Sequence, residues 1–288
     1  MSARNSTFLQ VPGLSHLCFM SFVCFNGTLV PAEQPLLTGS NRCFKWGDGL
    51  FETMKFSGGR LSLEHLHWER LRAGMELLEM DADSLRVDQL KENMLTLCRK
   101  NGLDMARVRL QVYRKDKNHA GHVMEALPLD ASVNEWQEPG MRLGLYTAAR
   151  KSQDAFSNMK TANFLPYVMA SRFAGRQQWD DALLLNASGH ICDTTRANIF
   201  LFIEGRIHTP ALAEGCVGGV MRRFLLEKFR AAGMDPVEGS LSIRQLEEAE
   251  EVFLSNSIFG IRSVRSFNGR SYPNDRAIKI YRDFIATM

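Results

Sequence analysis

A polar, irregular stretch near the middle of the chain constrains the fold more than any other feature of the sequence. From about Ala148 to Met159 the chain loses regular hydrophobic spacing, whereas strand-like and helix-like patterns lie on both sides. Such a stretch is typical of a linker between domains. The 288 residues are also enough for about two domains of roughly 150 residues each. The sequence therefore predicts a small α/β N-terminal domain at 20–149 and a larger C-terminal domain at 150–288.

The N-terminal half opens with β structure. Residues 1–19 are polar and irregular, so we expect a tail there, followed by a strand at 22–25. Asn26-Gly27 is a strong signal for a two-residue hairpin turn, because both positions tolerate positive φ. The other elements predicted in this half are strands at 50–56 and 107–114 and helices at 62–78 and 84–102, the second with Ser84 as its N-cap.

The C-terminal half alternates helices and strands without a repeat of fixed period. The spacing of apolar residues predicts helices at 164–178, 219–232 and 274–287 and strands at 182–185, 198–202, 251–255 and 260–264. This order is typical of an α+β or α/β arrangement. Taken with the first half, it indicates a two-domain α+β protein.

Composition and charge exclude several classes of function. Hydrophobic residues make up 45% of the chain and charged residues 23%, as in ordinary globular proteins. The net charge is only +3 and the basic residues are scattered, so we expect no nucleic-acid partner. No apolar run is long enough for a membrane span or a signal peptide. The six cysteines lack C-x-x-C spacing, which argues against a metal site or a disulfide framework and favours a reducing cytoplasm.

Three segments contain residues that could carry chemistry. The first runs from Trp46 to Glu52 and continues with His67 to Leu71; read alone, it is a glycine turn followed by the polar face of a helix. The second centres on Lys160, just before a helix. A partly desolvated lysine has the lowered pKa of a Schiff-base nucleophile, but spacing alone also fits a solvated side chain.

The third segment joins a polar run that begins at Cys192 to a glycine-rich run, Gly215 to Arg223, which opens a helix. Free N–H groups at a helix start bind anions, and phosphate is the natural guest. A helix that merely follows a glycine-rich turn is the alternative interpretation.

In this order and spacing, the segments resemble the class IV (fold-type IV) pyridoxal-phosphate enzymes: branched-chain and D-amino acid aminotransferases and 4-amino-4-deoxychorismate lyases. The resemblance spans about Phe25 to Asn268. The matching motifs are Gly47-Asp48…Phe51-Glu52, His67…Arg70-Leu71, Lys160…Asn163…Leu165, Asp193…Asn198-Ile199-Phe200 and Gly219-Val220-Met221-Arg222. The resemblance implies pyridoxal 5′-phosphate at the interface of two domains, and a homodimer in which each partner completes the other's site.

The resemblance also implies a role for individual residues. Lys160 matches the lysine that forms the internal aldimine and moves the substrate proton. Asp193 stands where the family usually has glutamate facing the pyridine nitrogen, so the charge is kept and the reach is shorter. The remaining cofactor-binding positions match Arg70, Val220, Met221 and Ser257 around the phosphate and Leu212 against one face of the ring. Met221 replaces a common threonine and offers only its amide.

Substrate choice is less defined. The candidate carboxylate partners are Arg107, Arg109 and Arg114, and Tyr167 lies near expected pocket positions. An aminotransferase that passes an amino group from an amino acid to a 2-keto acid is the leading interpretation. A 4-amino-4-deoxychorismate lyase that releases pyruvate is the alternative, favoured by the stretch 215–224 and by Asn256. A non-catalytic pyridoxal-phosphate-binding protein is more distant, since it has no need of Lys160.

Overall fold

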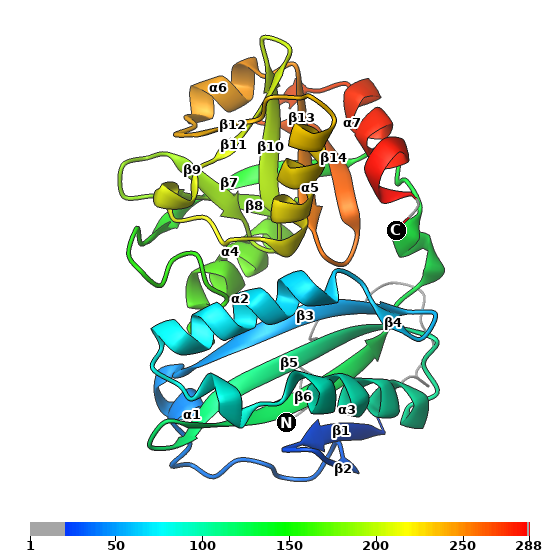
Figure 1. Ribbon diagram of the computed structural model, residues 1–288. Coiled ribbons are helices and arrows are strands. Elements are labelled where there is room, and N and C mark those ends of the chain that lie inside the picture. Colours follow the sequence, from blue (N-terminus) through cyan, green and yellow to red (C-terminus); the bar gives the residue numbers. More distant parts are fainter. Residues whose placement is uncertain (1–20, 287) are drawn as a thin grey trace, which may run out of the picture.

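The computed structural model describes residues 21–286 and 288, which form two β-sheets with helices packed on them (Figure 1). The tail predicted at 1–19 lies outside the described residues. The first sheet has the strand order β2-β1-β6-β5-β3-β4, and the second has the order β12-β11-β10-β13-β14-β7-β8-β9, with β15 beside β14. None of the helices in the described part of the chain is long and apolar enough to cross a membrane.

The first sheet contains only antiparallel pairs. The predicted hairpin is confirmed, because Asn26 and Gly27 have φ of 48° and 87° between β1 and β2. The elements of this half are β1 Phe22–Phe25, β2 Thr28–Pro31, α1 Arg42–Trp46, β3 Gly49–Ser57, β4 Arg60–Leu61, α2 Glu64–Leu77, α3 Val87–Lys100, β5 Met105–Asp116 and β6 His119–Pro128. Ser84 lies in a 3-10 turn, Ala82–Ser84, and α3 begins three residues later than predicted.

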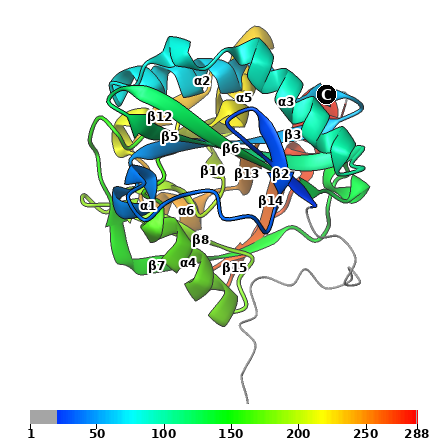
Figure 2. The same ribbon diagram turned by 90° about the horizontal axis from the view of Figure 1, so that it is seen from below.

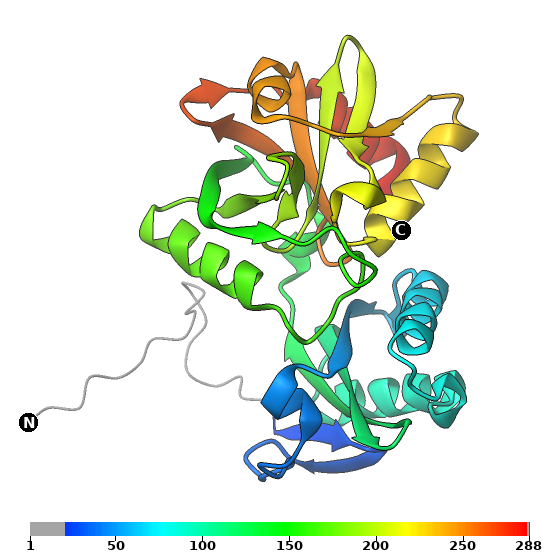
Figure 3. The same ribbon diagram turned by 90° about the vertical axis from the view of Figure 1, so that its left-hand side faces the viewer.

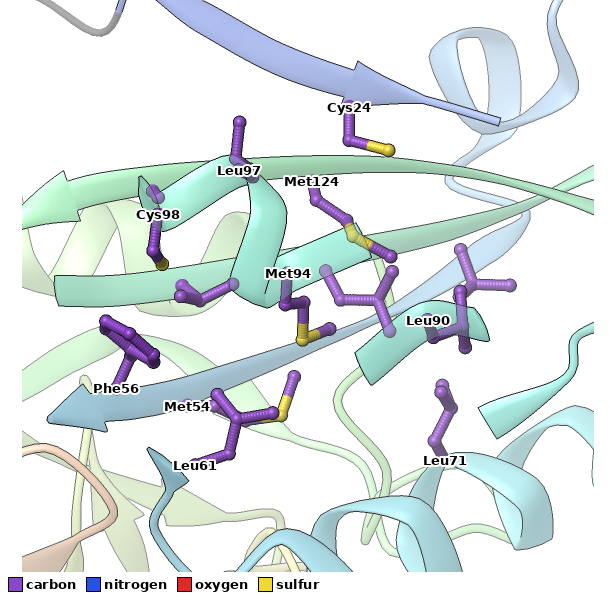
Figure 4. Close-up of a cluster of buried hydrophobic side chains, with 14 of the residues drawn as sticks. Cys24, Met54, Phe56, Leu61, Leu71, Leu90, Met94, Leu97, Cys98 and Met124 are labelled. Atoms are coloured by element: carbon purple, nitrogen blue, oxygen red, sulfur yellow. The ribbon is translucent and has the colours of Figure 1, made fainter. Parts of the chain in front are cut away.

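Helices α2 and α3 cover one face of this sheet (Figure 2). Successive side chains of a strand point to opposite faces, so Met54 and Phe56 of β3 join the core beneath the helices together with Met94 of α3 (Figure 4). Phe51 of β3 and Arg109 of β5 have the opposite parity. The second face of the sheet therefore carries aromatic and basic side chains toward the rest of the molecule.

The second sheet is mixed. Its strand β7 pairs in parallel with β8 and β14, β11 pairs in parallel with β12, and the other pairs are antiparallel. The elements are β7 Met141–Lys151, α4 Leu165–Arg176, β8 Asp181–Asn186, β9 Ile191–Thr194, β10 Asn198–Ile203, β11 Arg206–Pro210, α5 Val220–Ala231, β12 Val237–Gly239, α6 Ile243–Glu248, β13 Glu251–Asn256, β14 Gly260–Phe267, β15 Arg270–Ser271 and α7 Asp275–Ile280. The last predicted helix continues from α7 as a π-helical turn, Tyr281–Ile285.

The chain passes from one sheet to the other earlier than the sequence predicts. Residues 148–151, the start of the predicted linker, belong to β7, and Arg150 and Lys151 pair with β8 of the second sheet. The crossing segment is 129–140, between β6 and β7. The register of β7 shifts between Leu145 and Arg150, which interrupts the alternation of buried and exposed residues and makes this strand read as irregular.

The two sheets lie one above the other (Figure 3), and two backbone hydrogen bonds join β3 of the first sheet to the segment around residue 160. The N–H of Phe51 donates to the carbonyl of Lys160 at 2.8 Å, and the N–H of Ala162 donates to the carbonyl of Gly49 at the same distance. Leu50 and Thr161 thus form an isolated antiparallel bridge between β3 and the segment that follows β7. The first sheet therefore fixes the backbone of a segment that belongs to the second half of the chain.

Candidate active site

Lys160 lies where the two sheets meet. Its Nζ atom is 4.4 Å from the centre of the Phe51 ring and 5.5 Å from that of Phe164. Phe51 and Phe164 pack edge to face, with ring centres 5.1 Å apart. The lysine amine thus lies against two aromatic rings and lines a cavity between the sheets.

This environment changes the acidity of Lys160. Burial lowers the pKa of its ammonium group, and the cations Arg70 and Arg109 lower it further, while Glu52 and Asp193 raise it. The resulting pKa is about 7, against an ordinary value of 10.5. A large share of Lys160 is therefore the neutral, nucleophilic amine near neutral pH.

Arg70 lies on α2 and is fixed by a buried carboxylate. Glu52 accepts from Arg70 Nε at 2.8 Å and from the arginine's terminal nitrogen at 2.5 Å, and it lies 2.6 Å from Nδ1 of His67. Burial raises the pKa of Glu52, but Arg70 and His67 outweigh burial and lower it to about 2. Arg70 also donates to the carbonyl of Gly218 at 3.0 Å, so its guanidinium is held against the glycine-rich loop.

The glycine-rich loop leads into α5, whose first amides face the same cavity. Val220 and Met221 line the cavity and precede the first intrahelical bond, from the N–H of Arg223 to the carbonyl of Gly219 at 2.9 Å. A Cβ atom at Gly219 would lie 1.9 Å from Oδ1 of Asn198, so only glycine allows this close approach. Free amides beside Arg70 are an anion site.

The end of β13 and the turn after it supply two hydroxyl groups, those of Ser255 and Ser257, to this cavity. Ser257 lines the cavity, yet its hydroxyl donates to the carbonyl of Thr53 at 2.8 Å. Ser255 also lines the cavity and is buried, and its Oγ has no hydrogen-bond partner within the described residues. The sequence motifs did not point to Ser255, which is a further candidate because its buried hydroxyl lines the cavity without a partner.

Asp193 lies on β9 and lines the cavity that contains Lys160 and Arg70. It is buried and well supplied with donors. Its Oδ2 atom accepts from Lys151 Nζ at 3.2 Å, from the Tyr167 hydroxyl at 3.0 Å and from the N–H of Val217 at 2.9 Å. The Tyr167 hydroxyl therefore contacts Asp193, and Tyr167 lines the same cavity.

A second, larger cavity of about 830 Å³ shares Lys160, Phe164 and Ser257 with the first. Arg107 and Arg109 line it from β5. The guanidinium of Arg109 lies 3.8 Å from the centre of the Phe51 ring, which Lys160 also contacts, and donates to Oε1 of Gln111 at 3.0 Å. A cation suited to a carboxylate thus lies close to the lysine amine.

Two candidates from the sequence do not line these cavities. Arg114 points the other way, because its guanidinium donates to Asp48 and to the carbonyls of Leu78 and Glu79 at the end of α2. These contacts hold the Arg114 guanidinium outside both cavities. Leu212 is 41% exposed, and its Cδ2 atom lies beside the Gly218 position.

The residues present fit pyridoxal phosphate. The anion site at Arg70 and the start of α5 suits a phosphate, the orphaned Ser255 hydroxyl offers a further donor, and the buried carboxylate of Asp193 suits a protonated ring nitrogen. Lys160 lines the same cavity and supplies the amine that an aldehyde requires. The phosphate, the ring nitrogen and the aldehyde of the cofactor therefore each have a partner of matching chemistry.

The chain is similar to several known proteins of one family. The family model for amino-transferase class IV matches residues 49–267. Aminodeoxychorismate lyase from Vibrio harveyi is 27% identical over 82% of this chain and 88% of its own length, and D-alanine aminotransferase from Listeria monocytogenes is 23% identical over 86% and 88%. The branched-chain amino acid aminotransferase structure from Escherichia coli superimposes with a TM-score of 0.82 at 20% identity, covering 92% of this chain and 94% of that one, and shares the fold.

Proposed function

Because the chain belongs to the class IV aminotransferases, a family of enzymes that use pyridoxal phosphate, we propose that it transfers the amino group of an amino acid to a 2-keto acid. The observation that carries this proposal is the pair of cations on one aromatic ring. Arg109 and Lys160 lie 3.8 Å and 4.4 Å from the centre of Phe51. An amino acid held by its carboxylate at Arg109 would have its amine near Lys160.

The cofactor, when bound, supplies an aldehyde that accepts the amino group and a ring that accepts electrons from the substrate carbon. We assign the handling of its phosphate to Arg70, the amides of Val220 and Met221, and the Ser255 hydroxyl. We assign the ring nitrogen to Asp193. Lys160 holds the cofactor and moves the proton at the substrate carbon, because its lowered pKa lets it gain and lose a proton near neutrality.

A panel of amino donors tests the reaction. Added without a keto acid, at least one L- or D-amino acid should convert the yellow enzyme to its amine form and remove the visible absorption band. Arg109→Gln should raise KM for that donor about ten- to a hundredfold, since a charge-assisted contact is worth about 1.5–3 kcal/mol. Arg114→Gln is the matched control on the same strand and should leave KM unchanged. If no donor bleaches the band, amino-group transfer is not the reaction.

A lyase is the second candidate, and a specific observation favours it: the Vibrio harveyi relative named above, at 27% identity, is an aminodeoxychorismate lyase. The cavity of about 830 Å³ also has room for a cyclic acid. A lyase keeps the cofactor in its aldehyde form throughout. Release of pyruvate from aminodeoxychorismate, with no bleaching by any amino acid, would replace the first proposal with this one.

We also propose that the active enzyme is a homodimer. Large apolar side chains are exposed on α1 and α4, with Phe44 75%, Trp46 61% and Leu165 62% exposed. Trp46 and Leu165 line one hollow together with Phe156, so the two helices present a shared apolar surface. A second copy of this chain is the occupant that the family resemblance implies, and it would cover these side chains.

The mass in solution tests the dimer. Sedimentation equilibrium should give twice the chain mass of 32.6 kDa, and Leu165→Glu should shift the protein toward monomer. Leu77→Glu is a control, because Leu77 is an exposed leucine on α2 that lies outside the hollow between α1 and α4. A monomeric wild type with full activity would contradict the proposal.

A further inference from the structure

A second lysine lies close to the proposed cofactor site, and no motif accounts for it. Lys151 is the last residue of β7 and is 8% exposed. Its Nζ atom donates to Oδ2 of Asp193 at 3.2 Å and lies 4.8 Å from the centre of the Tyr167 ring. A buried lysine needs a partner for its charge, and Asp193 is the carboxylate that it contacts.

The local fold aims this side chain inward. The register of β7 relative to β8 shifts between Leu145 and Arg150, after which Lys151 lies beside Asn186. Between Leu145 and Arg150, β7 advances five residues while β8 advances two, from Leu183 to Leu185. The three extra residues are an odd number, so the side chains that follow point to the opposite face of the strand. Lys151 is buried, whereas Arg150 beside it is exposed.

The donors are distributed unequally over the two oxygens of Asp193. Oδ2 accepts from Lys151, from Tyr167 and from the N–H of Val217, whereas Oδ1 has only the longer contact of 3.2 Å to the Tyr167 hydroxyl. Oδ2 therefore already accepts three hydrogen bonds, whereas Oδ1 can accept a further one. An aspartate has fewer rotatable bonds than a glutamate, so fixing one oxygen also fixes the direction of the other.

We propose that Lys151 is a positioning residue that anchors Oδ2 of Asp193 and thereby presents Oδ1 to the pyridine nitrogen of the cofactor. The inference rests on the proposed function only in its use of pyridoxal phosphate, and not on the choice between aminotransferase and lyase. Lys151 contributes a fixed charge and a hydrogen bond, and it exchanges no atoms with substrate or cofactor.

Binding of pyridoxal phosphate to the apoenzyme tests the proposal without any substrate. Lys151→Met should weaken cofactor affinity about ten- to a hundredfold, the range for a lost charge-assisted hydrogen bond, and should shift the absorption maximum of the loaded enzyme. Lys151→Arg should recover part of both. Arg150→Met is the matched control, because it removes the neighbouring cation of the same strand, and it should leave both unchanged.

A double-mutant cycle separates positioning from a general structural role. In the Asp193→Asn background, Lys151→Met should cost little further affinity, since the charge that Lys151 anchors is gone. Lys151→Gln, which keeps a donor without the charge, replaces Lys151→Met if the apoenzyme of the latter loses its circular dichroism spectrum. Additive losses, or an equal loss in Arg150→Met, would overturn the inference. Wild type that binds no pyridoxal phosphate would overturn the proposed function as well, which distinguishes the two failures.

Discussion

Lys160→Ala is expected to lose turnover by a factor of thousands or more while it keeps its fold. The side chain contributes one amine against the rings of Phe51 and Phe164, and its removal leaves the backbone contacts of residue 160 to β3 in place. The chemistry, in contrast, loses both its point of attachment and its base. Steady-state kinetics and circular dichroism measure the two effects separately.

The control for this variant is a lysine of ordinary character. Lys115 is exposed at the end of β5, so Lys115→Ala should retain full activity. Borohydride reduction of the loaded wild type should place the cofactor's mass on the peptide that contains Lys160. An active Lys160→Ala enzyme, or a label on another lysine, would show that the assignment is wrong.

The second large effect concerns pH. At pH 7, a lysine with a pKa of about 7 is about half neutral, whereas one with the ordinary pKa of 10.5 is neutral in only about 1 molecule in 3,000. Only the neutral amine attacks an aldehyde. The rate of pyridoxal phosphate uptake by the apoenzyme should therefore rise about tenfold per pH unit below pH 7 and level off above it, a gain of about a thousandfold at neutrality over an ordinary lysine.

Stopped-flow absorbance across pH 5–10 measures this rate. Arg70 is one of the cations that lower the pKa of Lys160. In Arg70→Gln the pH at which the rate levels off, which we call the bend, should therefore move to a higher value. The plateau rate and the position of the bend are read separately, so weaker phosphate binding in this variant does not obscure the shift. A wild-type rate that keeps rising to pH 10 would contradict a lowered pKa.

The sequence predicts local elements well where one pattern dominates. The strand at 22–25, its Asn26-Gly27 turn, and the helix at 219–232 appear within one residue of the predicted bounds, because turn chemistry and hydrophobic spacing agree there. The motif around Lys160, Asp193 and Arg70 likewise predicts which side chains gather, and all three line one cavity.

The sequence does not predict features that depend on tertiary contacts. The strand β7 was interpreted partly as a linker, because a register shift hides its alternation. The orientation of Arg114 depends on the carbonyls at the end of α2, and that of the Ser257 hydroxyl depends on the position of the Thr53 carbonyl. Each of these is decided by a partner distant in sequence, which local pattern does not encode.

The bridge between Leu50 and Thr161 has a consequence for the order of assembly. The segment that carries Lys160 belongs to the second half of the chain, but hydrogen bonds to β3 of the first half hold its backbone in place. Neither half on its own contains the template that sets the lysine against Phe51. We therefore expect the chain to capture the cofactor only once the two halves have docked, so the visible colour of the loaded enzyme should report completed folding.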